Sequence, residues 1–280
     1  IAQYRTLSVS YVNLGKRFQY ALQGFSQTQF YYGQLQGLLY DPTLAPYVSR
    51  DLSQATRTVR GGTAFGIYPL NRYSRLEVSG GFVNLHEQYN DPALQAYSES
   101  YQQSNYGTQV FRNGNLVPLT ASFINETTVF REFGPLAGRT MKLSYDVAPK
   151  IGSTLSRQTL DADLRYYQRI ATTGVLALRF RGFKSYGAYP DFLYFGGNSE
   201  MRGYDYLSFV GQNSVFANAE LRFPLIEAAL TPVGVMGGVR GVFFANLGGG
   251  WFKDQGYSFA TSKAETVTPI TGYQTDAAGN

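Results

Sequence analysis

The chain has 280 residues, of which 44% are hydrophobic and 16% aromatic, and it contains 23 Tyr, 31 Gly and no Cys. This composition is that of a folded protein, and the absence of Cys excludes disulfides, zinc–thiolate sites and thiol nucleophiles. The net charge of +5 gives little support to an anionic partner such as a nucleic acid, because Lys and Arg are spread along the chain. No window of 18 residues is continuously apolar, so a transmembrane helix is not expected.

Polar and apolar side chains alternate along most of the chain, which predicts strands with one polar and one apolar face. In 157–169, for example, Asp163 and Arg165 occupy odd positions, whereas Leu160 and Leu164 occupy even ones. Several segments reach the ~9–11 residues that a tilted strand needs to cross a membrane. The predicted strands lie near residues 4–13, 17–31, 55–67, 72–88, 117–131, 137–149, 157–169, 173–185, 213–223 and 238–252.

The connections between these strands alternate in length. Short turns are expected at Gly15, 68–71, 132–136 and 169–174, and long polar loops at 32–54, 89–116 and 186–212; the segment 150–156 is a short connection on the long side. Bacterial outer-membrane barrels have this asymmetry, so the pattern favours such a barrel over the alternative, a soluble sandwich or lipocalin-like barrel. No strand is assigned within 32–54 or after Lys253.

The tyrosines have two interpretations. They can form the aromatic girdles of a membrane barrel, or they can fill a soluble β core. Tyr68, Tyr73 and Tyr89 lie near the ends of predicted strands, where girdle residues are expected.

The segment 194–252 carries the most specific motifs of the chain. A Gly196-Gly197 pair precedes Arg202-Gly203-Tyr204, and the strands "AELRFPL" and "GVRGVFFANLG" follow. This combination resembles the outer-membrane surface-antigen superfamily, which contains the BamA and TamA insertases and the two-partner secretion transporters. The close resemblance covers about a fifth of the chain, and the remainder agrees in strand pattern.

The resemblance implies a barrel of sixteen antiparallel strands whose sixth external loop, here 186–212, folds back into the lumen. Arg202 is then the loop-anchor arginine, and Glu220 is its acidic partner on the lumen wall. Where the family usually has an aspartate, this chain has Asn246, which can accept a hydrogen bond from Arg202 but adds no charge. Gly203 is expected to omit a Cβ where the loop passes close to the wall.

Two further expectations concern the Arg202–Glu220 pair. The alternation independently places Glu220 on the polar face of its strand, opposite Leu221 and Phe223. Removal of Arg202 is expected to leave Glu220 uncompensated, at ~3–5 kcal/mol if the pair is desolvated and nearer ~1 kcal/mol in a wet lumen.

The resemblance also implies a function. Residues 1–280 are interpreted as one outer-membrane barrel domain, incomplete at both ends, with about ten of the sixteen strands present and roughly three missing on each side. Such a barrel assists insertion or translocation of proteins at the bacterial outer membrane, without cofactors and without covalent chemistry. Its expected partners are outer-membrane lipids, client outer-membrane proteins and accessory periplasmic or lipoprotein subunits. The alternative is a passive pore, or an anchor for a fused periplasmic or surface domain.

Other candidate sites are weaker. His86, beside Glu87, is the only histidine and would be needed for any acid–base, metal or Ser–His chemistry, but a single His without clustered ligands is usually structural. Asp161 and Asp163 resemble a catalytic carboxylate pair, yet the nearby arginines favour a polar ladder along the lumen wall. No catalytic or metal-binding residue is therefore predicted.

Overall fold

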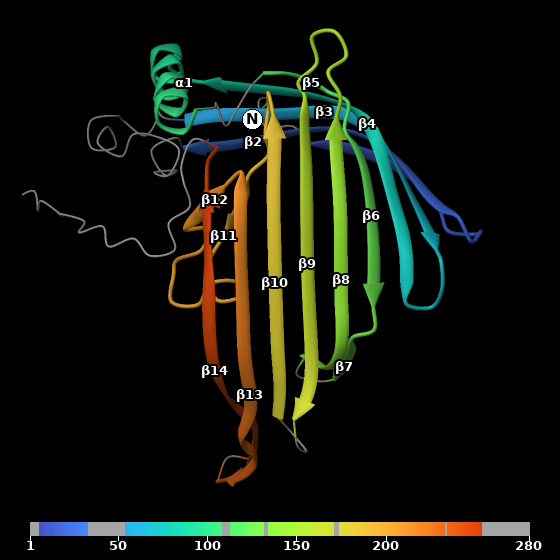
Figure 1. Ribbon diagram of the computed structural model, residues 1–280, viewed down its shortest axis with the longest axis vertical. Helices are drawn as coiled ribbons and strands as arrows, with labels where there is room; N and C mark the ends of the chain where they lie inside the picture. Colours follow the sequence, from blue (N-terminus) through green and yellow to red (C-terminus); the bar gives the residue numbers. More distant parts are fainter. Residues whose placement is uncertain are drawn as a thin grey trace, which may run out of the picture.

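The computed structural model describes residues 6–32, 54–107, 113–131, 134–170, 174–232 and 234–253. Ten long strands form one antiparallel sheet in which spatial order follows the chain, β1-β2-β3-β4-β6-β8-β9-β10-β13-β14 (Figure 1). The bounds of these strands are β1 Leu7–Asn13, β2 Gln19–Tyr32, β3 Gln54–Pro69, β4 Ser74–Tyr89, β6 Leu119–Glu126, β8 Gly134–Ala148, β9 Arg157–Ile170, β10 Gly174–Gly187, β13 Asn213–Thr231 and β14 Gly234–Trp251.

The shorter elements lie at the two ends of this sheet. The strand β5 (Gly114–Leu116) pairs with β4, and β7 (Val129–Arg131) pairs with β8. The hairpin of β11 (Leu193–Phe195) and β12 (Phe209–Gly211) forms a separate small sheet. One helix, α1 (Pro92–Tyr106), completes the described elements. The prediction of an all-β antiparallel fold is confirmed, because each of the ten predicted segments overlaps one long strand.

The two faces of the sheet differ as the alternation predicts. On β10, Leu178 and Phe180 point to the outer face and remain 39% and 44% exposed, whereas Arg179 and Arg181 take the intervening positions. The strand register extends this division to β9, where Arg165 lies opposite Arg179 of β10. The outer face is thus apolar and exposed, as a surface that meets lipid requires, and the concave face is polar.

The helix α1 lies within 89–116, where the sequence analysis expected a polar loop. Asp91 caps it by accepting a hydrogen bond from the Ala93 N–H at 2.8 Å, and Pro92 takes the first helical position. Gly107 ends the helix with a φ of 68°. The run "NDPALQAY" therefore contained the usual start signal of a helix, an Asp cap followed by Pro. Among the described residues, no helix is long and apolar enough to cross a membrane.

Three predicted strands have clearly different bounds in the structure. The segment 117–131 is interrupted between β6 and β7, where a Cβ on Gly138 of the facing strand would collide with the Thr127 carbonyl oxygen. The last hairpin is longer than predicted, because the alternation was followed only to Phe223. A register shift between Pro224 and Ile226 changes the alternation there, although the two strands stay paired to Thr231. The unassigned segments 33–53 and 254–280 lie outside the described residues.

The strands β2, β3 and β4 bend so that their loop ends cross the end of the sheet (Figure 1). Glycines allow β3 and β4 to approach each other closely at the bend, since a Cβ on Gly81 would collide with the Gly62 carbonyl oxygen. Beyond the bend, Ala55 and Tyr89 pack with Val210 and Phe252 in a buried apolar cluster. Tyr89 is only 4% exposed, so its assignment to an aromatic girdle is wrong.

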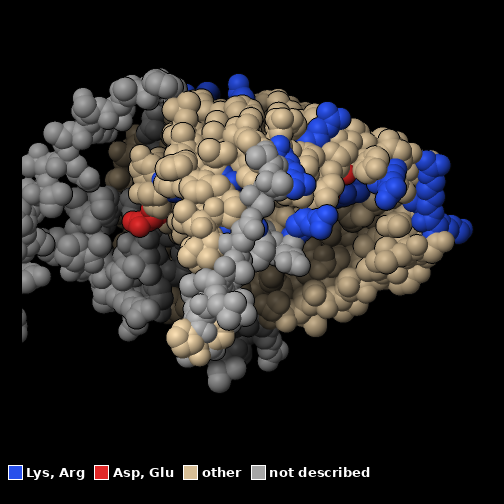
Figure 2. Space-filling view, turned by 90° about the horizontal axis from the view of Figure 1, so that it is seen from below, with Lys and Arg blue, Asp and Glu red and all other residues tan. Residues whose placement is uncertain are grey.

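The opposite end of the sheet carries the short turns. Tyr68 and Tyr73 are 39% and 50% exposed there, which agrees with a girdle position. Viewed from this turn end, the surface carries many more Lys and Arg side chains than Asp and Glu (Figure 2).

Candidate functional site: a loop against the concave face

The segment 186–212 connects β10 to β13 and contacts the concave face. Its hairpin places Leu193 opposite Gly211 and Phe195 opposite Phe209. Between the two strands the chain makes a tight turn in which the Met201 N–H donates to the Gly197 carbonyl at 2.9 Å. Gly196 and Gly197 have φ values of 142° and 80°, which a residue with a Cβ adopts only with strain. The predicted Gly-Gly pair therefore starts this turn.

An aromatic stack joins the loop to the sheet. Phe195 lies between Phe209 and Phe216, with ring centroids 5.2 and 5.1 Å away and nearly parallel planes. Phe195 and Phe216 are fully buried, and Met201 closes the same cluster at 3% exposure. Phe216 is on β13, at a concave-face position between Ser214 and Asn218. A single Phe among polar residues on that face is the sequence signal for this contact.

The motif arginine meets the predicted acidic residue. Arg202 donates from Nε and Nη2 to the same oxygen, Glu220 Oε1, at 3.1 and 3.0 Å. The other carboxylate oxygen, Oε2, accepts from Arg222 Nε at 2.8 Å. The Arg202 guanidinium also lies 5.5 Å from the centre of the Phe244 ring. Glu220 is therefore shared by one arginine of the loop and one of its own strand.

This arrangement corrects three expectations. Glu220 would not be left uncompensated without Arg202, because Arg222 remains on its second oxygen. Gly203 does not avoid a clash, since a Cβ there would have no atom within 4 Å; its φ of 90° is what favours glycine. Asn246 contacts the main chain of Arg202 and not its guanidinium. Its Nδ2 lies 3.3 Å from the Arg202 carbonyl, and the opposite amide orientation places Oδ1 2.8 Å from the Arg202 N–H.

Tyr204, the last residue of the motif, lies at the margin of the site. Its ring is 56% exposed and meets Phe209 edge-on, with centroids 4.9 Å apart. It therefore adds an outer contact to the aromatic stack.

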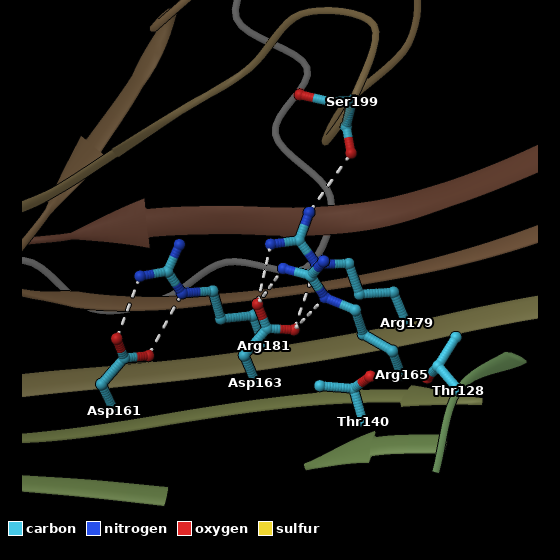
Figure 3. A network of polar contacts seen from close by, with 8 residues as sticks. All are labelled: Thr128, Thr140, Asp161, Asp163, Arg165, Arg179, Arg181 and Ser199. Atoms are coloured by element: carbon cyan, nitrogen blue, oxygen red, sulfur yellow. Dashed lines mark hydrogen bonds and ion pairs between the residues drawn. The ribbon is translucent and has the colours of Figure 1, made fainter. Parts of the chain in front are cut away.

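A second polar network on β9 and β10 also reaches the loop (Figure 3). Asp163 accepts two hydrogen bonds from Arg165 and two from Arg179, with Nη2–Oδ2 distances of 2.7 and 2.9 Å. Arg179 uses its remaining nitrogen, Nη1, to donate to the Ser199 carbonyl of the loop at 3.3 Å. Arg181 makes the neighbouring pair with Asp161 and does not extend to the loop (Figure 3). The predicted polar ladder is thus present, and one of its arginines contacts the loop.

The start of the loop borders a small cavity of about 230 Å³ under the bent strands. Arg157 of β9 bridges Asp146 of the wall at 3.0 Å and Asp191 of the loop at 3.4 Å. Tyr194 also lines this cavity, and burial raises its pKa to about 12. Its hydroxyl therefore stays protonated even at alkaline pH values at which an exposed tyrosine ionises.

The remaining candidates lie apart from this site. His86 is exposed on the outer face, opposite Thr58 of the neighbouring strand, and away from the concave polar wall. No group of three or more His, Asp or Glu side chains within the described ranges is placed to hold a metal ion. The residues of this site hold the loop 186–212 against the sheet by apolar stacking, an ion pair and hydrogen bonds to the loop backbone.

Comparison with known proteins identifies the fold. The sequence matches no protein-family profile and no curated protein. The structure is similar to BamA from Haemophilus ducreyi lacking POTRA domains 1–3, with a TM-score of 0.63 and 13% sequence identity. The match covers 88% of this chain and 49% of that chain, so this chain spans about half the length of the BamA structure. The fold of this chain therefore resembles that of a BamA-type β-barrel.

Proposed function

We propose that this chain belongs to an outer-membrane barrel of the BamA/TamA-like superfamily that assists insertion or translocation of proteins at the bacterial outer membrane. The observation that carries the proposal is the pairing of Arg202 with Glu220 in a chain with a BamA-type fold. The exposed apolar outer face supports a place among outer-membrane lipids, because lipid chains would remove its apolar side chains from water.

In this proposal the loop 186–212 is a strut, and Arg202 is its anchor. The planar guanidinium presents two N–H donors to the Glu220 carboxylate, a geometry that a lysine ammonium does not reproduce. The partners are client outer-membrane proteins, with accessory periplasmic or lipoprotein subunits. The mechanism is a rearrangement of non-covalent contacts, without a chemical reaction.

Reconstitution of the full-length protein in liposomes tests the proposal. Native protein is compared with Arg202→Ala and with Arg202→Lys, which keeps the charge but loses the planar fork. Arg181→Ala is the matched control, because it breaks an ion pair of the same wall that does not contact the loop. Folding is followed by heat-modifiable gel shift, and the insertion rate of a client barrel is measured in parallel.

The expected result is that native protein and the Arg181→Ala control accelerate client insertion, whereas the Arg202 variants fold but accelerate it less. A native barrel that folds and conducts ions but accelerates no client would contradict the insertase proposal. The alternative, a passive pore or an anchor for another domain, would then take its place.

A further inference from the structure

The turn end of the sheet carries a continuous basic rim, which we define as Lys16, Arg17, Arg72, Arg131 and Arg139. All five side chains are exposed, and they come from the ends of three successive hairpins. The hairpin ends are in contact: Arg17 donates to the Pro69 and Leu70 carbonyls at 3.2 Å. On the other side, the Glu126 N–H donates to the Tyr73 carbonyl at 2.8 Å.

The charge of the rim is not neutralised by nearby carboxylates of the described residues. Glu77 and Glu126 are the carboxylates closest to this end in the described part of β1 to β8, and both pair with Arg75. None of the five rim cations forms an ion pair with a described residue. At the loop end, in contrast, cations and carboxylates are interleaved, as in the Arg157 bridge between Asp146 and Asp191.

Exposed aromatic rings accompany the basic rim. The Arg17 guanidinium lies 4.9 Å from the centre of the Tyr68 ring, and that of Arg72 lies 5.7 Å from Tyr73. Arg139 is opposite Tyr166 in the sheet register, and Tyr166 is 46% exposed on the outer face. Directly inward from the rim, the outer face becomes apolar, for example at Leu76 and Val78.

From the turn end inward, the protein surface carries cations, then tyrosines, then apolar side chains. This order matches the layers of a bilayer, from the headgroups through the interface to the hydrocarbon core. We propose that the basic rim binds the headgroups of anionic phospholipids in the leaflet at the turn end. The five rim residues come from three hairpins instead of one, and the Lys and Arg side chains seen from this end are spread over the surface (Figure 2). This arrangement suits a ring of lipid phosphates better than a single acidic protein segment. The inference rests on the proposed membrane position of the barrel, and it adds a lipid preference to one end.

These 280 residues contain no Cys, so a single Cys introduced into them gives a local test, once any Cys elsewhere in the full-length protein has been replaced. A fluorescent NBD label is attached at Leu70→Cys, beside the rim, or at Ile151→Cys, at the loop end; both residues are exposed. The labelled barrel is folded into phosphatidylcholine vesicles that contain nitroxide-labelled phosphatidylglycerol or nitroxide-labelled phosphatidylcholine. The ratio of quenching by the two lipids measures local enrichment of the anionic headgroup.

The expected result is a several-fold preference for phosphatidylglycerol at Leu70→Cys and little at Ile151→Cys, since each nearby cation attracts anionic lipid by about fivefold. The preference should fall as salt is raised from ~0.01 M to ~1 M, where the Debye length shrinks from ~30 to ~3 Å. It should also fall in the triple variant Lys16→Gln/Arg72→Gln/Arg131→Gln. The matched triple variant Lys150→Gln/Lys184→Gln/Lys253→Gln, which removes exposed cations at the loop end, should retain it.

Two outcomes would overturn the inference: equal quenching by the two lipids at Leu70→Cys, or a preference that persists without the three rim cations. Neither outcome would contradict the proposed membrane location of the barrel. An acidic protein would then be the better partner for the rim. Absence of quenching by either lipid at both positions would instead contradict the proposed membrane location itself. The salt dependence of quenching in the Leu70→Cys protein with all rim cations present decides the matter even if the triple variant folds poorly.

Discussion

Two of the contacts that the loop 186–212 makes with the sheet are unlike: an aromatic stack and an ion pair. At the aromatic stack, Phe195 and Phe216 are excluded from solvent, whereas at the ion pair the Arg202 and Glu220 side chains keep 29% and 12% exposure. Burial of apolar area is strong but has no direction, while a charge-assisted hydrogen bond is directional and is weakened by remaining water. The stack should therefore supply most of the docking free energy, and the ion pair should fix where the loop lies.

The largest effect is expected from Phe195→Ala, because removal of a fully buried ring usually costs ~3–5 kcal/mol. Hydrogen exchange of backbone amides in 193–211 should become faster by several orders of magnitude, while β8 to β10 keep their protection. Tyr204→Ala is the matched control, since this exposed ring lies at the edge of the same cluster. Comparable deprotection in both variants would mean that the stack does not dominate docking.

A smaller effect, about 1–2 kcal/mol, is expected for Arg202→Ala, because the pair is partly exposed and Glu220 keeps Arg222. The same exchange measurement should show moderate deprotection, absent in Arg181→Ala. Combining Arg202→Ala with Phe195→Ala tests the proposed division of roles. If the two free-energy losses add, the contacts act independently, and a loss smaller than the sum would show that the ion pair forms only on a docked stack.

Arg179→Lys is expected to cost at most ~1 kcal/mol of loop docking. Lysine keeps a positive charge near Asp163 but cannot also reach the Ser199 carbonyl as the guanidinium does. Exchange should increase at the turn near Ser199 and remain unchanged near Phe209. A deprotection as large as that of Arg202→Ala would show that the β9–β10 network is an equal anchor.

The smallest effect is expected for Asn246→Asp, which introduces the carboxylate usual in the superfamily that the loop motif resembles. The side chain already faces the Arg202 main chain, so a new negative charge should raise protection of the loop by no more than ~0.5–1 kcal/mol. Loss of protection would mean that the donor Nδ2 of Asn246 matters more than the missing charge.

Much of the fold could be predicted because strands are specified by residues that are close together in the sequence. Alternation with a period of two gave the strands and their faces, and the asymmetry of the connections indicated a barrel with a long loop at 186–212. The partnership of Arg202 with Glu220 came from a resemblance between motifs. The helix α1 was missed although its cap was visible in Asp91 and Pro92, because the polar segment was interpreted as loop.

The sequence by itself determined which residues form strands, which side chains face the polar wall, and which arginine belongs to the loop. Only the tertiary structure decided that Arg222 shares Glu220, that Arg179 reaches Ser199 and that Phe195 stacks on Phe216. It also decided that Tyr89 is buried under the bent strands and not at a membrane girdle. The physical reason is that these contacts depend on strand register and on the bend at the glycines, which join residues distant in sequence, whereas side-chain alternation acts between neighbours.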